Sequence, residues 1–179
     1  GIHSISNGLA AAACAFAAGA SLTEIGRGLE NVALIPGRLQ RKVLSDSCVL
    51  IDDSYNANPD SFKTAIDVLS MANSHRILVM GDMGELGEHA EKSHREVGAY
   101  AKKAQLNTLY AVGINSAAAS EEFNGRHFPN QDSLIDSLKA RIIELEAQHE
   151  SITILVKGSR SSVMENIIQA LVSGGKSSC

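Results

Sequence analysis

From about residue 38 to residue 174, short aliphatic runs alternate with longer segments of helical periodicity, a pattern that few folds can accommodate. The runs are rich in Val, Ile and Leu and have the length of strands, whereas the longer segments repeat apolar residues along one helical face. Strand followed by helix, several times over, indicates an α/β fold with a mostly parallel sheet and helices on both faces. The predicted strands are residues 39–44, 48–51, 76–80, 108–112 and 152–156, and the predicted helices are residues 59–72, 88–104, 116–123, 132–149 and 161–172.

The arrangement of the first two predicted strands is left open by the sequence. Only residues 45–47 separate them. They are either two successive strands of the alternating pattern or a hairpin that adds an antiparallel edge to the sheet.

Two further helices are predicted before the alternating region. Residues 6–18 are rich in Ala, and Ser21 with Glu24 forms a capping box that begins a second helix. The pair Pro36-Gly37 then interrupts the helical pattern. Because the chain has about 1.2 times the usual domain length, we expect one complete domain preceded by a two-helix remnant. The expected segments are residues 1–37, residues 38–174 and a frayed polar tail at residues 175–179.

Composition excludes several classes of function. The net charge of -4 and the lack of a basic block argue against a nucleic-acid partner. The most apolar stretch, residues 8–20, is too short for a bilayer span and lacks a basic leader, so no membrane insertion is expected. The three cysteines are odd in number and outside any C-x-x-C spacing, which favours a reducing, cytoplasmic location.

Three loops after predicted strands carry residues suited to chemistry, and ligands of such sheets bind at the carboxyl ends of the strands. Residues 52–59 begin with two carboxylates, which can hold a ribose diol or a metal-bound water. Residues 81–87 have the spacing G-x-x-G-x-x-G, which allows close approach of a ligand but differs from the dinucleotide fingerprint. Residues 157–162 place two cations and three hydroxyls at a predicted helix start, where a carboxylate or phosphate would bind.

Each loop also has a purely structural interpretation. In chain order, these are a solvated turn that caps a helix, a kinked loop without a ligand, and a capped helix with surface cations.

Other kinds of site are not supported by the sequence. Residues 175–177 resemble the end of a phosphate-binding Walker loop, but Ala170 stands in place of its first glycine. The six histidines lack zinc-ligand spacing and are expected to be solvated or capping, so no metal site is predicted.

Taken together, these loops and two further motifs resemble the C-terminal part of the Mur ligases. Within that family, the tyrosine-asparagine form of the acidic loop and the Gly-Asp-Met loop resemble the branch that adds D-alanyl-D-alanine. The five motifs occur in order over nearly the whole chain, at residues 1–12, 35–38, 52–61, 80–87 and 155–160.

The resemblance implies an ATP-dependent, amide-bond-forming ligase of peptidoglycan synthesis in the bacterial cytoplasm, acting as a monomer. Its partners would be ATP, UDP-N-acetylmuramoyl-tripeptide and D-alanyl-D-alanine, joined through an acyl phosphate. The chain would comprise the last helices of the central ATPase domain and the Rossmann-like C-terminal domain. The Walker loop and the magnesium ligands are expected outside this sequence, so the chain alone is expected to be inactive. Alternatives are another Mur ligase, a folylpolyglutamate synthase-like amide ligase, or a non-catalytic ligand-binding domain of the same fold.

The resemblance also implies roles for individual residues. Arg38 matches the junction arginine that reaches the γ-phosphate of ATP, and is the predicted catalytic residue. Asn7 matches the asparagine that contacts adenine, and Asp53 matches the aspartate that holds the ribose hydroxyls. The remaining residues implied on the nucleotide side are His3, Asp52, Tyr55, Asn56 and Asn58. The residues implied to bind the dipeptide and the tripeptide end are Asp82, Glu85, Lys157, Ser159 and Arg160.

Overall fold

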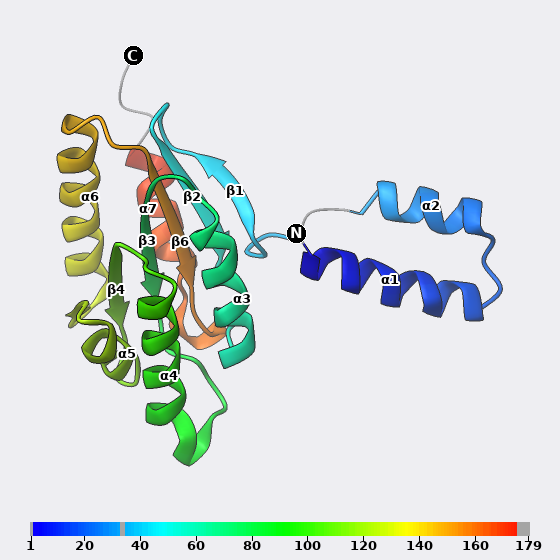
Figure 1. Ribbon diagram of the computed structural model, residues 1–179, viewed down its shortest axis with the longest axis horizontal. Coiled ribbons are helices and arrows are strands. Elements are labelled where there is room, and N and C mark those ends of the chain that lie inside the picture. The colour runs from blue at the N-terminus through cyan, green and yellow to red at the C-terminus, as the bar shows by residue number, and fades with distance from the viewer. Residues whose placement is uncertain (1, 33–34, 175–179) are drawn as a thin grey trace. The chain divides into compact units, whose positions relative to one another are not determined.

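The computed structural model describes residues 2–32 and 35–174, with the side chains of residues 2–4, 6 and 174 outside the description. The chain divides into two compact units, Gly1–Ile35 and Pro36–Cys179 (Figure 1). The predicted frayed tail, residues 175–179, lies outside the described residues. None of the described helices is both long and apolar enough to cross a membrane.

The first unit is a pair of helices, α1 (Ile2–Ala17) and α2 (Leu22–Glu30). The predicted capping box is confirmed: the Ser21 side chain accepts a hydrogen bond from the Glu24 amide, and the Glu24 carboxylate accepts one from the Ser21 amide at 2.8 Å. No residue of α2 is buried. Since packing of an apolar face supplies most helical stability, this pair needs packing partners beyond its own two helices. The exposed large apolar side chains of the unit are Ile5, Leu9, Phe16, Leu22, Leu29, Val32 and Ile35.

The second unit is built on a sheet of six strands in the order β1-β2-β6-β3-β4-β5. Five strands are parallel, and β1 pairs with β2 in antiparallel register, so the hairpin is the arrangement that forms. Every residue of β6 is buried, as expected for a strand inserted between two others and covered on both faces. The strands are β1 (Gln40–Val43), β2 (Cys48–Asp53), β3 (His75–Met80), β4 (Thr108–Val112), β5 (Arg126–Phe128) and β6 (Ile152–Lys157).

Helices cover both faces of the sheet and form two hydrophobic cores. One core joins the sheet to α6 (Gln131–Ala147) and α7 (Glu165–Gly174). The other core joins it to α3 (Pro59–Ser70), α4 (Ala90–Lys103) and α5 (Ser116–Phe123). The predicted α/β architecture with a mostly parallel sheet is therefore confirmed (Figure 1).

Three elements differ clearly from the sequence prediction. Helix α1 begins at Ile2, four residues before the predicted start at Ser6. Strand β5 was not predicted, because it has three residues of which two are exposed, and so has no aliphatic run. The last helix begins at Glu165 rather than Ser161, because residues 160–162 form a 3-10 turn and Val163 has a φ of +45°. A β-branched residue in this left-handed region interrupts a helix. The loop 157–162 is thus not directly at the start of a long helix, contrary to the prediction.

The two cysteines in the described residues should react very differently. Cys48 begins β2 and is 1% exposed, and burial raises the pKa of its thiol to about 12. Cys14 on α1 is exposed. Because the thiolate is the reactive form, we expect iodoacetamide at pH 8 to label Cys48 roughly 10³-fold more slowly than Cys14. Peptide mass mapping before and after denaturation measures this, and fast labelling of native Cys48 would contradict its place in the core.

Candidate functional site

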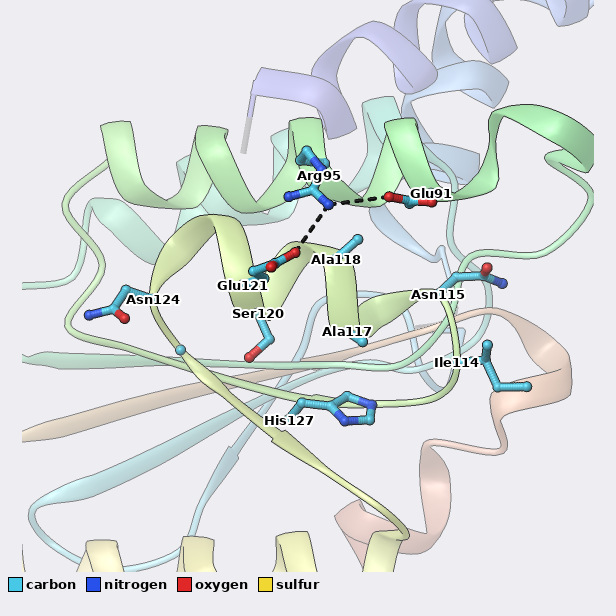
Figure 2. Close-up of a pocket in the computed structure, with 11 residues that line it drawn as sticks. Glu91, Arg95, Ile114, Asn115, Ala117, Ala118, Ser120, Glu121, Asn124 and His127 are labelled. Atoms are coloured by element: carbon cyan, nitrogen blue, oxygen red, sulfur yellow. Dashed lines mark hydrogen bonds and ion pairs between the residues drawn. The ribbon is translucent and has the colours of Figure 1, made fainter.

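A groove of about 700 Å³ lies along α5, between α4 and β5 (Figure 2). Arg95 spans one wall, where its guanidinium pairs with Glu91 at 3.2 Å and with Glu121 at 3.1 Å. His127, on the opposite side, shares a hydrogen bond of 2.8 Å with the Gly113 carbonyl. The ionic groups named here are therefore already paired within the protein. None of the residues that the motifs imply as site residues lines this groove.

The three motif loops instead meet at one edge of the sheet. In the strand register, Asp53 at the end of β2 stands beside Lys157 at the end of β6, and Lys157 stands beside Met80 at the end of β3. Loops 52–59, 81–87 and 157–162 thus leave the sheet as neighbours, although 104 positions separate Asp53 from Lys157 in the chain. This adjacency at the carboxyl ends of parallel strands is where an α/β fold places its ligand.

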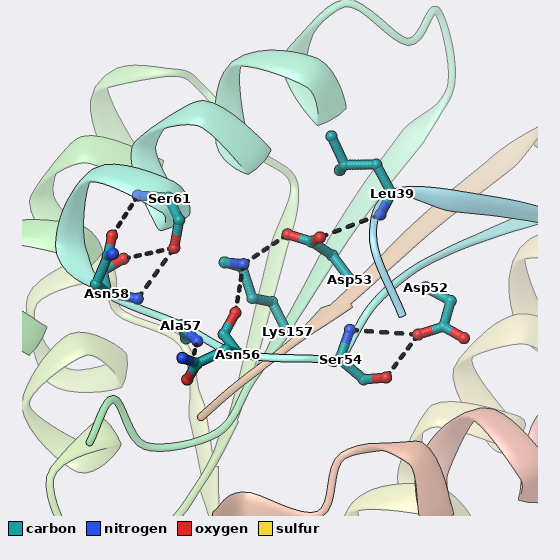
Figure 3. Close-up of polar contacts among 9 residues, drawn as sticks. All are labelled: Leu39, Asp52, Asp53, Ser54, Asn56, Ala57, Asn58, Ser61 and Lys157. Atoms are coloured by element: carbon teal, nitrogen blue, oxygen red, sulfur yellow. Dashed lines mark hydrogen bonds and ion pairs between the residues drawn. The ribbon is translucent and has the colours of Figure 1, made fainter. Parts of the chain in front are cut away.

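Asp53 and Lys157 form a buried ion pair at the centre of this edge (Figure 3). The Lys157 Nζ atom lies 2.6 Å from Asp53 Oδ2, and the two side chains are 3% and 12% exposed, respectively. The ammonium also donates to the Asn56 carbonyl at 2.9 Å. The second oxygen of Asp53 accepts a hydrogen bond of 3.1 Å from the Leu39 amide. The carboxylate is thereby fixed in orientation while keeping lone pairs for a ligand.

Asp52 does not act as a partner of Asp53, contrary to the interpretation of the two as one carboxylate pair. Neighbouring strand residues point to opposite faces of a sheet. Asp52 Oδ1 accepts hydrogen bonds from the Ser54 hydroxyl at 2.6 Å and the Ser54 amide at 3.2 Å, and Oδ2 lies 3.7 Å from Lys42 Nζ (Figure 3). These contacts stabilise the turn after β2. A diol bound to Asp53 would therefore not bind Asp52 at the same time.

Arg38 is exposed to solvent, and its side chain contacts the loop after β2. Its guanidinium carbon lies 4.6 Å from the centre of the Tyr55 ring, within the range of a cation–π contact. The Tyr55 amide donates to the Gly37 carbonyl at 2.9 Å. Gly37 has a φ of +73°, and a Cβ there would lie 2.9 Å from the Tyr55 nitrogen, so this close approach requires glycine. Among the described residues, no carboxylate pairs with Arg38, which leaves its fork available to an anion.

The two asparagines of the same loop also serve the protein itself. Asn58 caps α3: its side chain accepts from the Ser61 amide at 2.8 Å, and the Ser61 hydroxyl accepts from the Asn58 amide at 3.0 Å. The Asn56 side chain accepts from the Ala57 amide at 2.8 Å. The structural interpretation of this loop is therefore valid for Asn58, and Arg38, Tyr55, Asn56 and Asn58 are all exposed.

Asp82 joins the loops that follow three strands. Its side chain accepts a hydrogen bond of 2.7 Å from the Ser116 amide at the start of α5, after β4. Its carbonyl accepts from the Ser159 amide at 2.8 Å and from the Ser162 hydroxyl at 3.1 Å, both after β6. The Asp82 side chain is 24% exposed, so it can contact a ligand while holding these loops together.

The other predicted substrate residues divide into exposed and buried groups. Glu85 is exposed and has a φ of +61°, an unusual conformation for this residue type and a common one at ligand-binding loops. Arg160 is exposed but pairs with Glu165 at 2.8 Å. Ser159 is buried at 3% exposure, and Lys157 is buried in its ion pair. Of the predicted substrate-binding set, Asp82, Glu85 and Arg160 are thus accessible.

His94 belongs to this site and was missed by sequence reasoning, which expected solvated or capping histidines. It is fully buried, Nε2 accepts from the Met83 amide at 2.9 Å, and Nδ1 donates to the Ala90 carbonyl at 2.7 Å. The ring is therefore neutral, with its hydrogen on Nδ1, because Nε2 accepts. One signal existed: His94 shares helical spacing with Val97 and Ala101 on the buried face of α4.

The two predicted adenine-side residues lie on α1, in the first unit. Asn7 is exposed, and the side chain of His3 is outside the described residues. In the part of the chain that the structure describes, no group of three or more His, Cys, Asp or Glu side chains is placed to hold a metal ion.

Comparisons with known proteins show what the whole chain is similar to. Over 176 residues the chain is 44% identical to UDP-N-acetylmuramoyl-tripeptide--D-alanyl-D-alanine ligase of Escherichia coli, covering 98% of this chain and 38% of the relative. The ligase of the same name from Haemophilus influenzae is 42% identical, covering 96% and 37%. The crystal structure of MurF from Acinetobacter baumannii matches with a TM-score of 0.85 and 35% identity, covering 97% of this chain and 38% of that one.

The chain thus spans well under half the length of these relatives. Residues 37–160, which include the loops after β2 and β3 and the first part of the loop after β6, match the family described as Mur ligase, glutamate ligase domain. On this match and on the identity to its relatives, the chain belongs to the Mur ligase family.

Proposed function

We propose that this chain is the C-terminal part of an ATP-dependent ligase that joins D-alanyl-D-alanine to UDP-N-acetylmuramoyl-tripeptide in the bacterial cytoplasm. The observation that carries the proposal is the exposed Arg38, held on Tyr55 and followed by Leu39, whose amide donates to the buried Asp53 carboxylate, in a chain 44% identical to a ligase of that name. A guanidinium without a carboxylate partner among the described residues, together with a carboxylate held by the neighbouring residue, suits a nucleotide, whose phosphates are anionic and whose ribose donates hydrogen bonds.

In the proposed reaction, the tripeptide carboxylate attacks the γ-phosphorus of ATP and ADP leaves. The amine of D-alanyl-D-alanine then attacks the acyl phosphate, and inorganic phosphate leaves as the amide forms. Arg38 would stabilise negative charge on the transferring phosphoryl group. Asp53 would accept hydrogen bonds from the ribose hydroxyls, and Asp82 and Glu85 would face the dipeptide. Closure over these groups would exclude water, which otherwise hydrolyses an acyl phosphate.

The remaining parts of the proposal concern the longer protein. The Walker loop and the magnesium ligands would lie in other segments of that protein, which acts as a monomer. The helix pair α1–α2 would belong to the ATPase domain, a placement supported by its exposed apolar side chains. The 179-residue chain by itself is then expected to be inactive.

Phosphate release by the full-length protein tests this function. We expect turnover with ATP, the UDP-muramoyl tripeptide and D-alanyl-D-alanine together, and no turnover when the dipeptide is omitted or when the 179-residue chain is used alone. A panel of amines provides the control. Turnover with glutamate or another single amino acid in place of the dipeptide would indicate a sister ligase. Binding of ATP and dipeptide without turnover by the full-length protein would indicate a non-catalytic domain.

A further inference from the structure

Lys157 is placed where it cannot easily touch a substrate. It is the last residue of the central strand β6, and its side chain is 3% exposed. Its ammonium faces Asp53 at 2.6 Å and the Asn56 carbonyl at 2.9 Å, and lies 5.6 Å from the centre of the Phe62 ring. A buried ammonium is tolerated only when it is paired and hydrogen-bonded, and these contacts meet that requirement. Any influence of Lys157 on a ligand must therefore pass through its neighbours.

The two hydrogen-bond partners of Lys157 connect it to the residues that adjoin Arg38. Asp53 accepts the amide of Leu39, the residue after Arg38, at 3.1 Å. The Asn56 carbonyl belongs to the residue after Tyr55, whose ring carries the Arg38 guanidinium. The ammonium thus joins the Asp53 carboxylate, which accepts the Leu39 amide, to the Asn56 carbonyl (Figure 3).

We propose that Lys157 is a positioning residue for the nucleotide: its hydrogen bond holds the Asp53 carboxylate in the orientation that the ribose hydroxyls require. The proposal rests on the proposed function, in which Asp53 is the ribose-binding group. Without the ammonium, the Asp53 carboxylate would keep only the Leu39 amide as a partner and would lose its fixed rotamer. Ribose hydroxyls gain from a preorganised, charged acceptor and gain little from a mobile or protonated one.

The test compares ATP with 2′,3′-dideoxy-ATP in the full-length ligase, because the analogue lacks the hydroxyls that Asp53 would bind. For the wild type we expect kcat/KM to favour ATP by about tenfold or more, as for a hydrogen bond to a charged group. In Lys157→Met the ratio of kcat/KM for ATP to kcat/KM for the analogue should fall to about twofold or less. The KM for D-alanyl-D-alanine should stay within about twofold of wild type. The matched control is Lys63→Met, which removes an ammonium that pairs with Asp60 at the surface of α3 and should leave the ratio unchanged.

Two further variants separate the possible failures. Asp53→Asn should reduce the nucleotide ratio as much as Lys157→Met, and the double variant should reduce it no further. If Asp53→Asn keeps the wild-type ratio, the ribose role in the proposed function is wrong. If Asp53→Asn loses the preference for ATP over the dideoxy analogue but Lys157→Met retains it, the positioning role of Lys157 is overturned. If thermal melting shows that Lys157→Met does not fold, Lys157→Gln, which retains a hydrogen-bond donor, takes its place. A wild-type preference for ATP over the dideoxy analogue in Lys157→Gln would also overturn the proposal.

Discussion

Under the proposed function, replacing Arg38 by Ala in the full-length protein is expected to lower kcat by about 10³-fold, with a much smaller change in the KM for ATP. The guanidinium is exposed, free of a carboxylate partner among the described residues, and supported by the Tyr55 ring at 4.6 Å. It can therefore meet charge that develops on the transferring phosphoryl group without first breaking an ion pair. Steady-state phosphate release, with ATP varied at saturating tripeptide and dipeptide, measures the effect.

Two variants control for this result. Arg38→Lys keeps the charge but lacks the planar guanidinium, which can donate two parallel hydrogen bonds and stack on Tyr55. We therefore expect its kcat to lie between that of Arg38→Ala and that of the wild type. Arg41→Ala removes an exposed arginine from β1, three residues along, and should change kcat by less than about twofold. If Arg38→Ala kept more than a tenth of the wild-type kcat, Arg38 would not be the group that stabilises phosphoryl transfer.

Replacing Gly98 by Val is expected to lower the free energy of unfolding of the chain by about 3 kcal/mol. Gly98 lies on α4 where that helix crosses α5, and a Cβ there would lie 2.8 Å from the Cα atom of Ala119 and 2.9 Å from its carbonyl carbon. Backbone atoms cannot move aside as a flexible side chain can, so α4 and α5 would have to separate. Urea denaturation followed by circular dichroism measures the loss.

The neighbouring residue provides the control for Gly98. Ala99 is exposed on the same helix, so Ala99→Val tests the intrinsic helix cost of valine without the contact to α5, and should cost less than about 1 kcal/mol. Equal stability of the two variants would contradict the close packing of α4 on α5. Because α4 also carries His94, which accepts from the Met83 amide, a separated α4 should also loosen the loop after β3.

Much of the fold could be predicted because its signals are local. The aliphatic run that ends in Ile51 and the one that ends in Val156 have the length and composition of buried strands, and both form. The start of α3 was predicted from Pro59, which takes the first-turn position. Local signals failed at β5, which has no aliphatic run, and at Val163, where a left-handed residue delays the last helix to Glu165.

The candidate site was predicted less completely, and the reason is the same for each residue. Lys157 was expected to bind substrate, but the structure buries its ammonium against Asp53. Asp52 and Asp53 were interpreted as a pair, although the alternation of a strand separates them. His94 was expected to be solvated, yet it supports the loop after β3. Residue type and spacing identify which side chains can do chemistry, but not which of them the protein already uses.

By itself, the sequence of this chain determined the α/β architecture, the order of every element except β5, and the resemblance to the Mur ligase family, because periodicity, capping and motifs each involve only a few neighbouring positions. Only the tertiary structure decided that β6 lies between β2 and β3, and hence that Lys157 faces Asp53 across 104 positions of sequence. Strand order depends on which apolar faces pack together in the complete fold, and no local pattern records that choice.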